Sequence, residues 1–298
     1  VMIGAGIFAL VGQVAGLAGD WFPVAFIAGA AVAGVSSYAY ARYSSVNPSA
    51  GGIAMLLKDA YGPGVVAGSF SLFMYVSMVV AESLLARTFG TYLLRPFGLQ
   101  DSVVLVPLLG VIAIAAAAVV NLVSNQLVER SALVTAVLKI VGIAVLAAAG
   151  LIGAAATGAG FFSDGSDSGD GLLGVVAAVA LCVLAYKGFT TITNQGDDLK
   201  DAKRNIARSI MISIAICAVL YLLITLSVGA SIGASGAIDA RDYALAEAAH
   251  PLFGAWGVGI TVAVAVIATL SGLLASLFSV SRLYGMLQDM KQAPALPA

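Results

Sequence analysis

Residues 1–19 read VMIGAGIFALVGQVAGLAG and contain no Asp, Glu, Lys or Arg. Five of these 19 residues are glycines, which interrupt the apolar run. A transmembrane α-helix needs about 20 mostly apolar residues, so this stretch is long enough to cross a bilayer. Gly4 and Gly6 both fall near its start, and glycine weakens a helix because its backbone has more freedom to lose. The stretch therefore predicts a membrane span with a weak point near its beginning.

The rest of the chain repeats the apolar pattern. Of its 298 residues 61% are hydrophobic and 10% are charged, and the mean hydropathy is +1.04, whereas a soluble domain carries about 25% charged residues. Backbone polar groups in lipid must be satisfied within the segment, so each span is expected to be a helix. The sequence predicts an all-α polytopic membrane protein with about eight spans, near residues 1–17, 22–42, 64–94, 102–123, 131–155, 171–195, 206–233 and 252–287.

The charges between the spans predict the orientation. Connections after even-numbered spans, with the C-terminal tail, hold nine basic residues, and connections after odd-numbered spans hold two. The nine are Arg42, Lys58, Arg130, Lys200, Lys203, Arg204, Arg208, Arg282 and Lys291, and the two are Arg95 and Arg241. Cytoplasmic loops carry an excess of Lys and Arg, so we expect the even connections and the N-terminus in the cytoplasm. The high Ala, Val and Gly content favours a bacterial source, and hence the bacterial plasma (inner) membrane.

Composition also excludes several classes of function. The net charge of −1 provides no basic face for nucleic acid. One His and two Cys are too few for a zinc or iron–sulfur cluster, and we expect no metal and no cofactor. An enzyme within the membrane would need a nucleophile with a base, or metal ligands. The single histidine, His250, falls in an expected outer loop before Pro251, so we expect no enzymatic activity.

Two glycine-containing clusters lie at matching places, in the first and sixth spans. The first is Gly4-Ala5-Gly6-Ile7-Phe8, and the second runs from Ala185 through Tyr186, Lys187 and Gly188 to Thr191. Interrupted spans at corresponding positions of two halves are typical of a transporter binding site, because a broken helix frees backbone N–H and C=O groups. A helix N-terminus freed in this way binds a carboxylate. The alternative is that Gly4 and Gly6 only allow close helix packing.

Three ionisable side chains fall inside spans: Glu82, Lys139 and Lys187. A charge in the membrane is costly, so each is a candidate functional residue. An apolar environment disfavours the charged form of a side chain, so Lys139 or Glu82 would exchange a proton during a transport cycle; a permanently paired Lys139 is the alternative. Lys187 lies in the expected break, where it would meet a substrate carboxylate or pair with Glu82.

Four motifs resemble the amino acid–polyamine–organocation superfamily of permeases, which has the LeuT-type inverted-repeat helix bundle. Gly4 to Phe8 resembles the G-x-G-I-F signature of helix one, and Asn47 to Gly52 resembles P-x-A-G-G after helix two. Asp197 to Ile206 resembles the acidic and R-N-I motif after helix six, with Ala202 and Ala207 replacing family prolines. Ser279 to Tyr284 resembles the end of helix eight.

This resemblance implies a single transmembrane domain over residues 1–298 and a twelve-helix complete protein, of which we expect this chain to be a fragment. Residues 1–155 would form the first five-helix repeat with a truncated helix one, and residues 171–287 would be helices six to eight of the second repeat. The substrate would bind along Gly4, Ala5, Gly6 and Ile7 and along Ala185, Tyr186, Lys187 and Gly188. Lys139 matches the lysine of proton-coupled members in helix five, although the charge of Lys187 departs from many members.

The expected function is that of a secondary active transporter that moves amino acids or related small amines, by proton coupling or exchange. Its partners would be the small-molecule substrate, the proton and the lipid bilayer. Two alternatives stay open: a carrier of another small ion, with Lys187 selecting negative substrates, and a transporter-derived sensor without flux.

Overall fold

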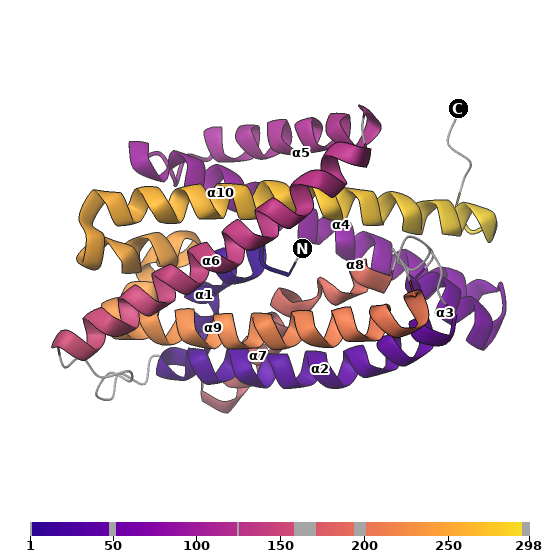
Figure 1. The fold of residues 1–298 in the computed structure, drawn as a ribbon, viewed down its shortest axis with the longest axis horizontal. Coiled ribbons are helices and arrows are strands. Elements are labelled where there is room, and N and C mark those ends of the chain that lie inside the picture. Colours follow the sequence, from indigo (N-terminus) through magenta and orange to yellow (C-terminus); the bar gives the residue numbers. More distant parts are fainter. Residues whose placement is uncertain (1, 48–51, 124, 158–170, 194–200, 294–298) are drawn as a thin grey trace.

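The computed structural model describes residues 2–47, 52–123, 125–157, 171–193 and 201–293, and the described part is all-α (Figure 1). Where the structure describes the connection between two helices, it is a short turn or a 3-10 segment. Their bounds are α1 Ala5–Ala18, η1 Gly19–Trp21, α2 Phe22–Val46, α3 Gly52–Tyr61, α4 Val65–Leu94, η2 Arg95–Phe97, α5 Leu105–Val123, α6 Asn125–Thr157, α7 Gly171–Tyr186, α8 Phe189–Thr193, α9 Ala202–Ala240, η4 Arg241–Tyr243 and α10 Ala244–Asp289.

The predicted spans correspond to α1, α2, α4, α5, α6, α7 with α8, α9 and α10. By length and composition, seven apolar segments of the described chain are able to cross a membrane, and the first of them, Gly6–Val46, contains both α1 and α2. The prediction of an all-α polytopic membrane protein is therefore confirmed. The sequence missed α3, because its ten residues are too short and too mixed in polarity to stand out as a span.

The connection between the seventh and eighth spans was expected to be a loop, and that prediction is wrong. Gly233, with φ 70°, ends the straight part of α9, and Gly254, with φ 56°, precedes the straight part of α10. Glycine adopts these left-handed angles at little cost. The residues between the two glycines form a helical hairpin whose turn is η4.

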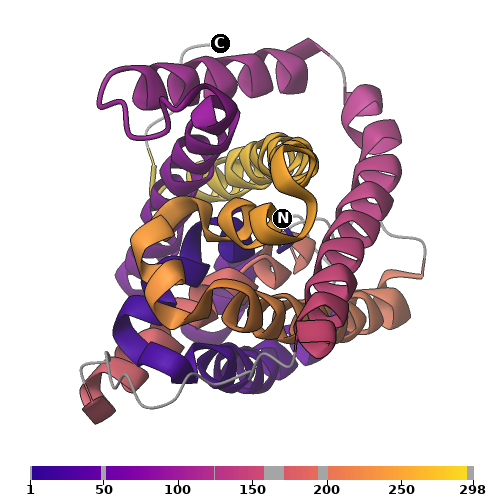
Figure 2. The same ribbon diagram turned by 90° about the vertical axis from the view of Figure 1, so that its left-hand side faces the viewer.

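The helices pack in two groups. In the first, α1, α2, α7 and α9 contact one another, and in the second α4, α5 and α10 do so. The two groups also contact each other, since α9 and α1 pack on α10 and α1 packs on α4, and α6 contacts both α9 and α10. Figure 1 shows α2 beside α9 at one face of the molecule and α5 beside α10 at the opposite face. Figure 2 gives the view along the bundle, in which the first helix lies enclosed by the others.

The start of α1 is the centre of the packing. Ile7, Phe8 and Val11 are fully buried. Large apolar side chains such as Val103, Leu122 and Leu172 lie on the outside of the molecule, as expected where lipid is the solvent. The fold therefore places the first glycine cluster in the interior, where substrate chemistry would be sheltered from lipid.

Candidate functional site

The first glycine cluster forms the beginning of a helix. α1 begins at Ala5 and not at residue 1, and Gly4 precedes it with φ −156° and ψ −128°. The N–H of Gly4 donates to the carbonyl oxygen of Met2 at 2.9 Å. The N–H groups in the first turn of a helix have no carbonyl partner within that helix. The N–H groups of Ala5, Gly6 and Ile7 are therefore directed out of the N-terminal end of α1.

The second cluster interrupts a span, as the sequence predicted. α7 ends at Tyr186, a turn holds Lys187 and Gly188, and α8 begins at Phe189. The turn is closed by hydrogen bonds from Lys187 N–H to Leu184 O at 3.2 Å and from Thr190 N–H to Lys187 O at 3.1 Å. The last carbonyl groups of a helix lack partners within it, so the end of α7 presents acceptors that suit an ammonium group.

The two interruptions touch each other, which the sequence did not reveal. A Cβ atom added at Gly6 would lie 2.8 Å from the Cα of Ala185, and one added at Gly188 would lie 2.5 Å from the backbone N of Met2. Backbone atoms cannot move away cheaply, so only glycine fits at both positions. Close packing at Gly6, the alternative that the sequence left open, is therefore present at the start of α1.

A cavity of about 60 Å³ lies where the two interruptions meet. A buried water needs about 10–15 Å³ on this measure, so the space holds a few waters or a small ligand group. Four predicted substrate residues, Gly6, Ala185, Lys187 and Gly188, line it. Thr190 and Thr191, the polar end of the second cluster, also line it, although they were not predicted as substrate residues. The lining residues that sequence reasoning missed are Met2, Leu10, Met78, Ala81, Leu84, Leu85, Leu184 and Ser276.

The remaining predicted substrate residues do not line this cavity. The side chain of Ile7 is fully buried in the core, and that of Tyr186 packs against Tyr221 with ring centroids 5.1 Å apart. Gly4 caps α1 beside the cavity, and the side chain of Ala5 lies outside the described part of the chain. Side chains at these positions follow the helix period, so neighbours in sequence point in different directions.

A wider cavity of about 960 Å³ adjoins the first and shares Leu10, Ala81, Leu84 and Leu184 with it. The η4 turn also lines this cavity and holds Asp242, whose two carboxylate oxygens bond to side chains on different helices. Oδ1 accepts a hydrogen bond from Nε2 of Gln13 on α1 at 3.0 Å, and Oδ2 pairs with Nη2 of Arg87 on α4 at 3.2 Å. These contacts join residues distant in sequence, and no motif pointed to them.

Lys187 does not pair with Glu82, although both residues are described. Its Nζ donates instead to Oγ of Ser77 on α4 at 2.5 Å. Lys187 therefore lines the cavity with a neutral partner, and its positive charge remains uncompensated by any carboxylate within ion-pair distance among the described residues.

Lys139 and Glu82 are both buried, and both lie against α10. Nζ of Lys139 donates to Oγ of Ser271 at 2.9 Å. The carboxylate of Glu82 lies beside Ser276, but neither of its oxygens has a hydrogen bond of good geometry in the described residues. A buried carboxylate without partners costs free energy, so Glu82 is a candidate for binding a proton or a ligand.

Three motifs of the sequence resemblance add little to this geometry. Residues 48–51 and 194–200 lie outside the described part of the chain, so four of the six residues of the motif after the second span, and four of the ten after the sixth, cannot be placed. Ser279 to Tyr284 lie within α10, where the Arg282 guanidinium covers the Phe278 ring at 4.5 Å from its centroid. Ser276, one helical turn before this stretch, lines the cavity, whereas Ser279 to Tyr284 do not.

Comparison with known proteins gives a family and two relatives. The model of a family described as amino acid permease matches residues 1–292. The chain is 31% identical to the inner membrane transport protein YbaT of Escherichia coli, over 99% of this chain and 68% of that protein. It is 27% identical to the uncharacterized protein MJ0609 of Methanocaldococcus jannaschii, over 86% of this chain and 58% of that protein.

Proposed function

We propose that this chain, which belongs to the amino acid permease family, is the substrate-binding part of a secondary transporter for amino acids or related small amines. The observation that carries the proposal is the contact between the two helix interruptions at one cavity. There Gly6 meets Ala185 and Gly188 meets Met2.

An amino acid fits this arrangement by its two charged ends. Its carboxylate would accept hydrogen bonds from the free N–H groups of Ala5, Gly6 and Ile7, and it would be favoured by the positive end of the α1 dipole. Its ammonium would donate to the carbonyl groups at the end of α7, around Ala185 and Tyr186. Backbone groups recognise the part common to all amino acids, so the lining side chains would select the variable part.

Proton coupling would use Lys139 and Glu82. Each is buried on a helix of its own, α6 or α4, and each lies against α10. A proton gained or lost at a buried site changes the local charge, and thereby the relative stability of two helix arrangements. The Lys139–Ser271 bond joins α6 to α10, so deprotonation of the lysine would weaken that contact.

The test is uptake of a labelled amino acid mixture by liposomes that hold the full-length protein, with and without an inward proton gradient. We expect uptake to rise with the gradient, and Lys139→Ala to lose the gradient dependence. Ser271→Ala is the matched variant, because it keeps the charge and removes only the hydrogen bond. Uptake that is equally strong in Lys139→Ala would contradict the coupling role.

A second candidate is a carrier of small organic anions, favoured by the uncompensated charge of Lys187 at the cavity. The same liposomes distinguish the two functions. Uptake of acetate or another small carboxylate, with none of any amino acid by a protein known to be folded, would replace the amino acid proposal. Binding without uptake of either class would favour a sensor without flux.

A further inference from the structure

One polar side chain of α5, Asn121, reaches across to the backbone of α10. Its Nδ2 donates to the carbonyl oxygen of Leu274 at 3.2 Å and to that of Ala117, one turn earlier on α5, at 2.9 Å. An amide nitrogen carries two hydrogens, so these two bonds use both. Asn121 lines neither of the two cavities described above, and its second bond therefore serves the placement of α10 on α5.

The bond lies in the middle of the segment of α10 that contacts both candidate coupling residues. Three residues before the bonded carbonyl, Ser271 accepts the hydrogen bond from Nζ of Lys139 on α6. Two residues after it, Ser276 lines the smaller cavity and lies beside Glu82 of α4. Asn121 therefore holds α10 between the lysine contact and the cavity.

Helix geometry connects the bonded carbonyl to Ser271. In an α-helix each N–H donates to the carbonyl four residues earlier, so the N–H of Ala275 donates to the carbonyl of Ser271. This N–H and the carbonyl of Leu274 belong to one planar peptide unit. A bond that fixes the Leu274 carbonyl thus also fixes the turn of α10 that carries the Ser271 hydroxyl.

The helix that bears Asn121 is itself firmly held, because glycines let α4 and α5 pack closely. A Cβ added at Gly90 would lie 2.5 Å from the carbonyl oxygen of Val106, and one added at Gly110 would lie 3.1 Å from that of Ala86. Backbone atoms cannot move away cheaply from such contacts. The two helices therefore pack as one unit, from which Asn121 reaches α10.

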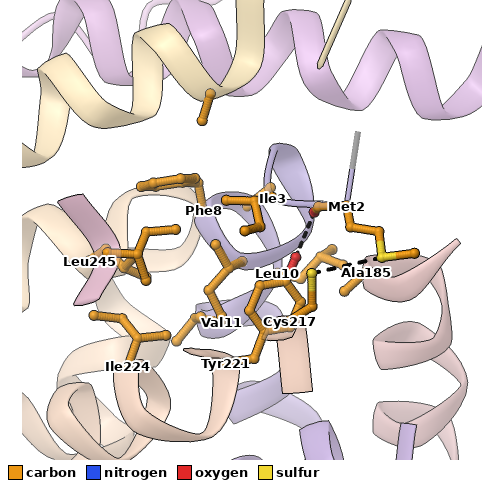
Figure 3. Close-up of a cluster of buried hydrophobic side chains, with 14 of the residues drawn as sticks. Met2, Ile3, Phe8, Leu10, Val11, Ala185, Cys217, Tyr221, Ile224 and Leu245 are labelled. Carbon is orange, nitrogen blue, oxygen red and sulfur yellow. Dashed lines mark hydrogen bonds between the residues drawn. The ribbon is translucent and has the colours of Figure 1, made fainter. Parts of the chain in front are cut away.

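The surroundings of Lys139 make the Ser271 hydroxyl important to it. No described carboxylate lies within ion-pair distance of the ammonium, and Glu82 approaches α10 from α4 at Ser276. On α9, Cys217 is the titratable side chain that interacts with Lys139, and its thiol also lies 3.7 Å from the Met2 sulfur (Figure 3). A thiol is a weak acceptor, so the hydroxyl is the stronger acceptor for the protonated lysine.

We propose that Asn121 is a positioning residue for proton coupling: by holding the Leu274 carbonyl, it keeps the Ser271 hydroxyl in place for Lys139. The inference rests on the proposed function and adds to it a residue of α5. A hydrogen bond from a charged donor is stronger than one from a neutral donor, so a well-placed hydroxyl favours the protonated lysine. With the hydroxyl displaced, a higher proton concentration is needed to protonate Lys139.

The chain provides a selective variant and a matched control. Asn121→Thr removes the bond between helices and keeps one within α5, because a threonine hydroxyl in a helix donates to the carbonyl four residues earlier, as Thr261 does at 2.9 Å. Thr269→Val deletes a fully buried hydroxyl of α10 whose bonds go to Ala265 and Val266 of the same helix. A general effect on packing would appear in both variants, whereas a positioning effect would appear only in Asn121→Thr.

The experiment measures labelled amino acid uptake by full-length protein in liposomes, over a series of external pH values at constant internal pH. Asn121→Thr is expected to raise the proton concentration at half-maximal uptake about fivefold, the effect of losing one hydrogen bond, while Thr269→Val keeps the wild-type value. Ser271→Ala should raise it at least as much. Adding Asn121→Thr to Ser271→Ala should cause no further rise, because a residue that acts through the hydroxyl has no effect once the hydroxyl is absent.

Each outcome decides the question. A wild-type midpoint in Asn121→Thr, an equal shift in Thr269→Val, or shifts that add in the double variant would overturn the positioning role. An Asn121→Thr protein that does not fold would overturn it as well, since the bond would then serve stability. Failure of the proposed function is recognised in the wild type itself, as absent amino acid uptake or uptake independent of external pH, and the positioning role would fall with it.

Discussion

At the scale of the residue, Lys187 is the group whose role depends most on its neighbours. It lies in the turn between α7 and α8 and lines the central cavity, and it is held by the neutral hydroxyl of Ser77. A neutral partner leaves its charge available to a ligand, whereas a carboxylate partner would have cancelled it. The absence of an ion pair with Glu82 therefore strengthens the case for contact between Lys187 and the substrate.

We predict that Lys187→Ala changes substrate preference. Removing a charged hydrogen-bond donor costs about 1.5–3 kcal/mol of binding, so the affinity for a ligand that uses this charge should fall by about tenfold or more. The measurement is competition of unlabelled glutamate and alanine against labelled uptake. Ser77→Ala, which keeps the charge, should retain the wild-type preference. If both variants preserve the order of the two competitors, Lys187 has no direct role.

The depth of these charges could be predicted from the sequence, but their partners could not. Apolar runs around Lys139 and Glu82 placed both residues within the membrane. The partner of Lys139, however, is Ser271, which follows it by 132 positions, and that pairing is decided by how α6 packs on α10. The hydrogen bond from Tyr221 to Met2 joins residues 219 positions apart, and an ordinary tyrosine in an apolar helix gave no signal of it.

At the scale of the element, the packing of α1 on α7 requires glycine at position 6 but not at position 16. A Cβ at Gly6 would lie within 3.0 Å of three atoms of Ala185, whereas a Cβ at Gly16, farther along α1, would have no neighbour within 4 Å. Both residues lie in the same helix, so their helix propensities are alike. Any difference between substitutions at the two sites thus reports helix packing.

Gly6→Ala should separate α1 from α7 and reduce uptake strongly, while Gly16→Ala should leave uptake near the wild-type level. Overpacking of a tight contact costs about 1–3 kcal/mol, so the melting temperature of Gly6→Ala should fall as well. Both quantities are measurable on purified full-length protein, by thermal unfolding and by liposome uptake. A pair of variants with equal behaviour would refute the close contact between the two helices.

The break between α7 and α8 was predictable because Gly188 and the onset of polar residues mark it in the sequence. The helical hairpin between Gly233 and Gly254 was not predicted, since its mixed composition suits a loop as well as short helices. There the left-handed angles of the two glycines decide the path of the chain, and the η4 turn between them packs against α1 and α4.

At the scale of the whole molecule, the orientation in the membrane follows from loop charge and stays a prediction. The even-numbered connections, including α3, should face the cytoplasm, and the turn between α4 and α5 should face outward. Cys182 and Cys217 are both buried, so a membrane-impermeant thiol reagent should give little background. The molecule thus permits a direct test by introduced cysteines.

Asp101→Cys, in the exposed turn before α5, should be labelled by an impermeant maleimide on intact cells, and Ala60→Cys, on the exposed side of α3, should be labelled only after the cells are opened. The physical reason is that the loops with the excess of basic residues stay in the cytoplasm. Labelling of Ala60→Cys on intact cells, with Asp101→Cys protected, would invert the assigned topology.

Asp242 links the two helix groups at the end of the molecule that carries η4. One of its oxygens holds Gln13 of α1 and the other holds Arg87 of α4, and α1 and α4 belong to different groups. Because a single carboxylate makes both bonds, α1 cannot part from α4 there while both remain intact. A movement that separates α1 from α4 at η4 therefore requires at least one of the two bonds of Asp242 to break.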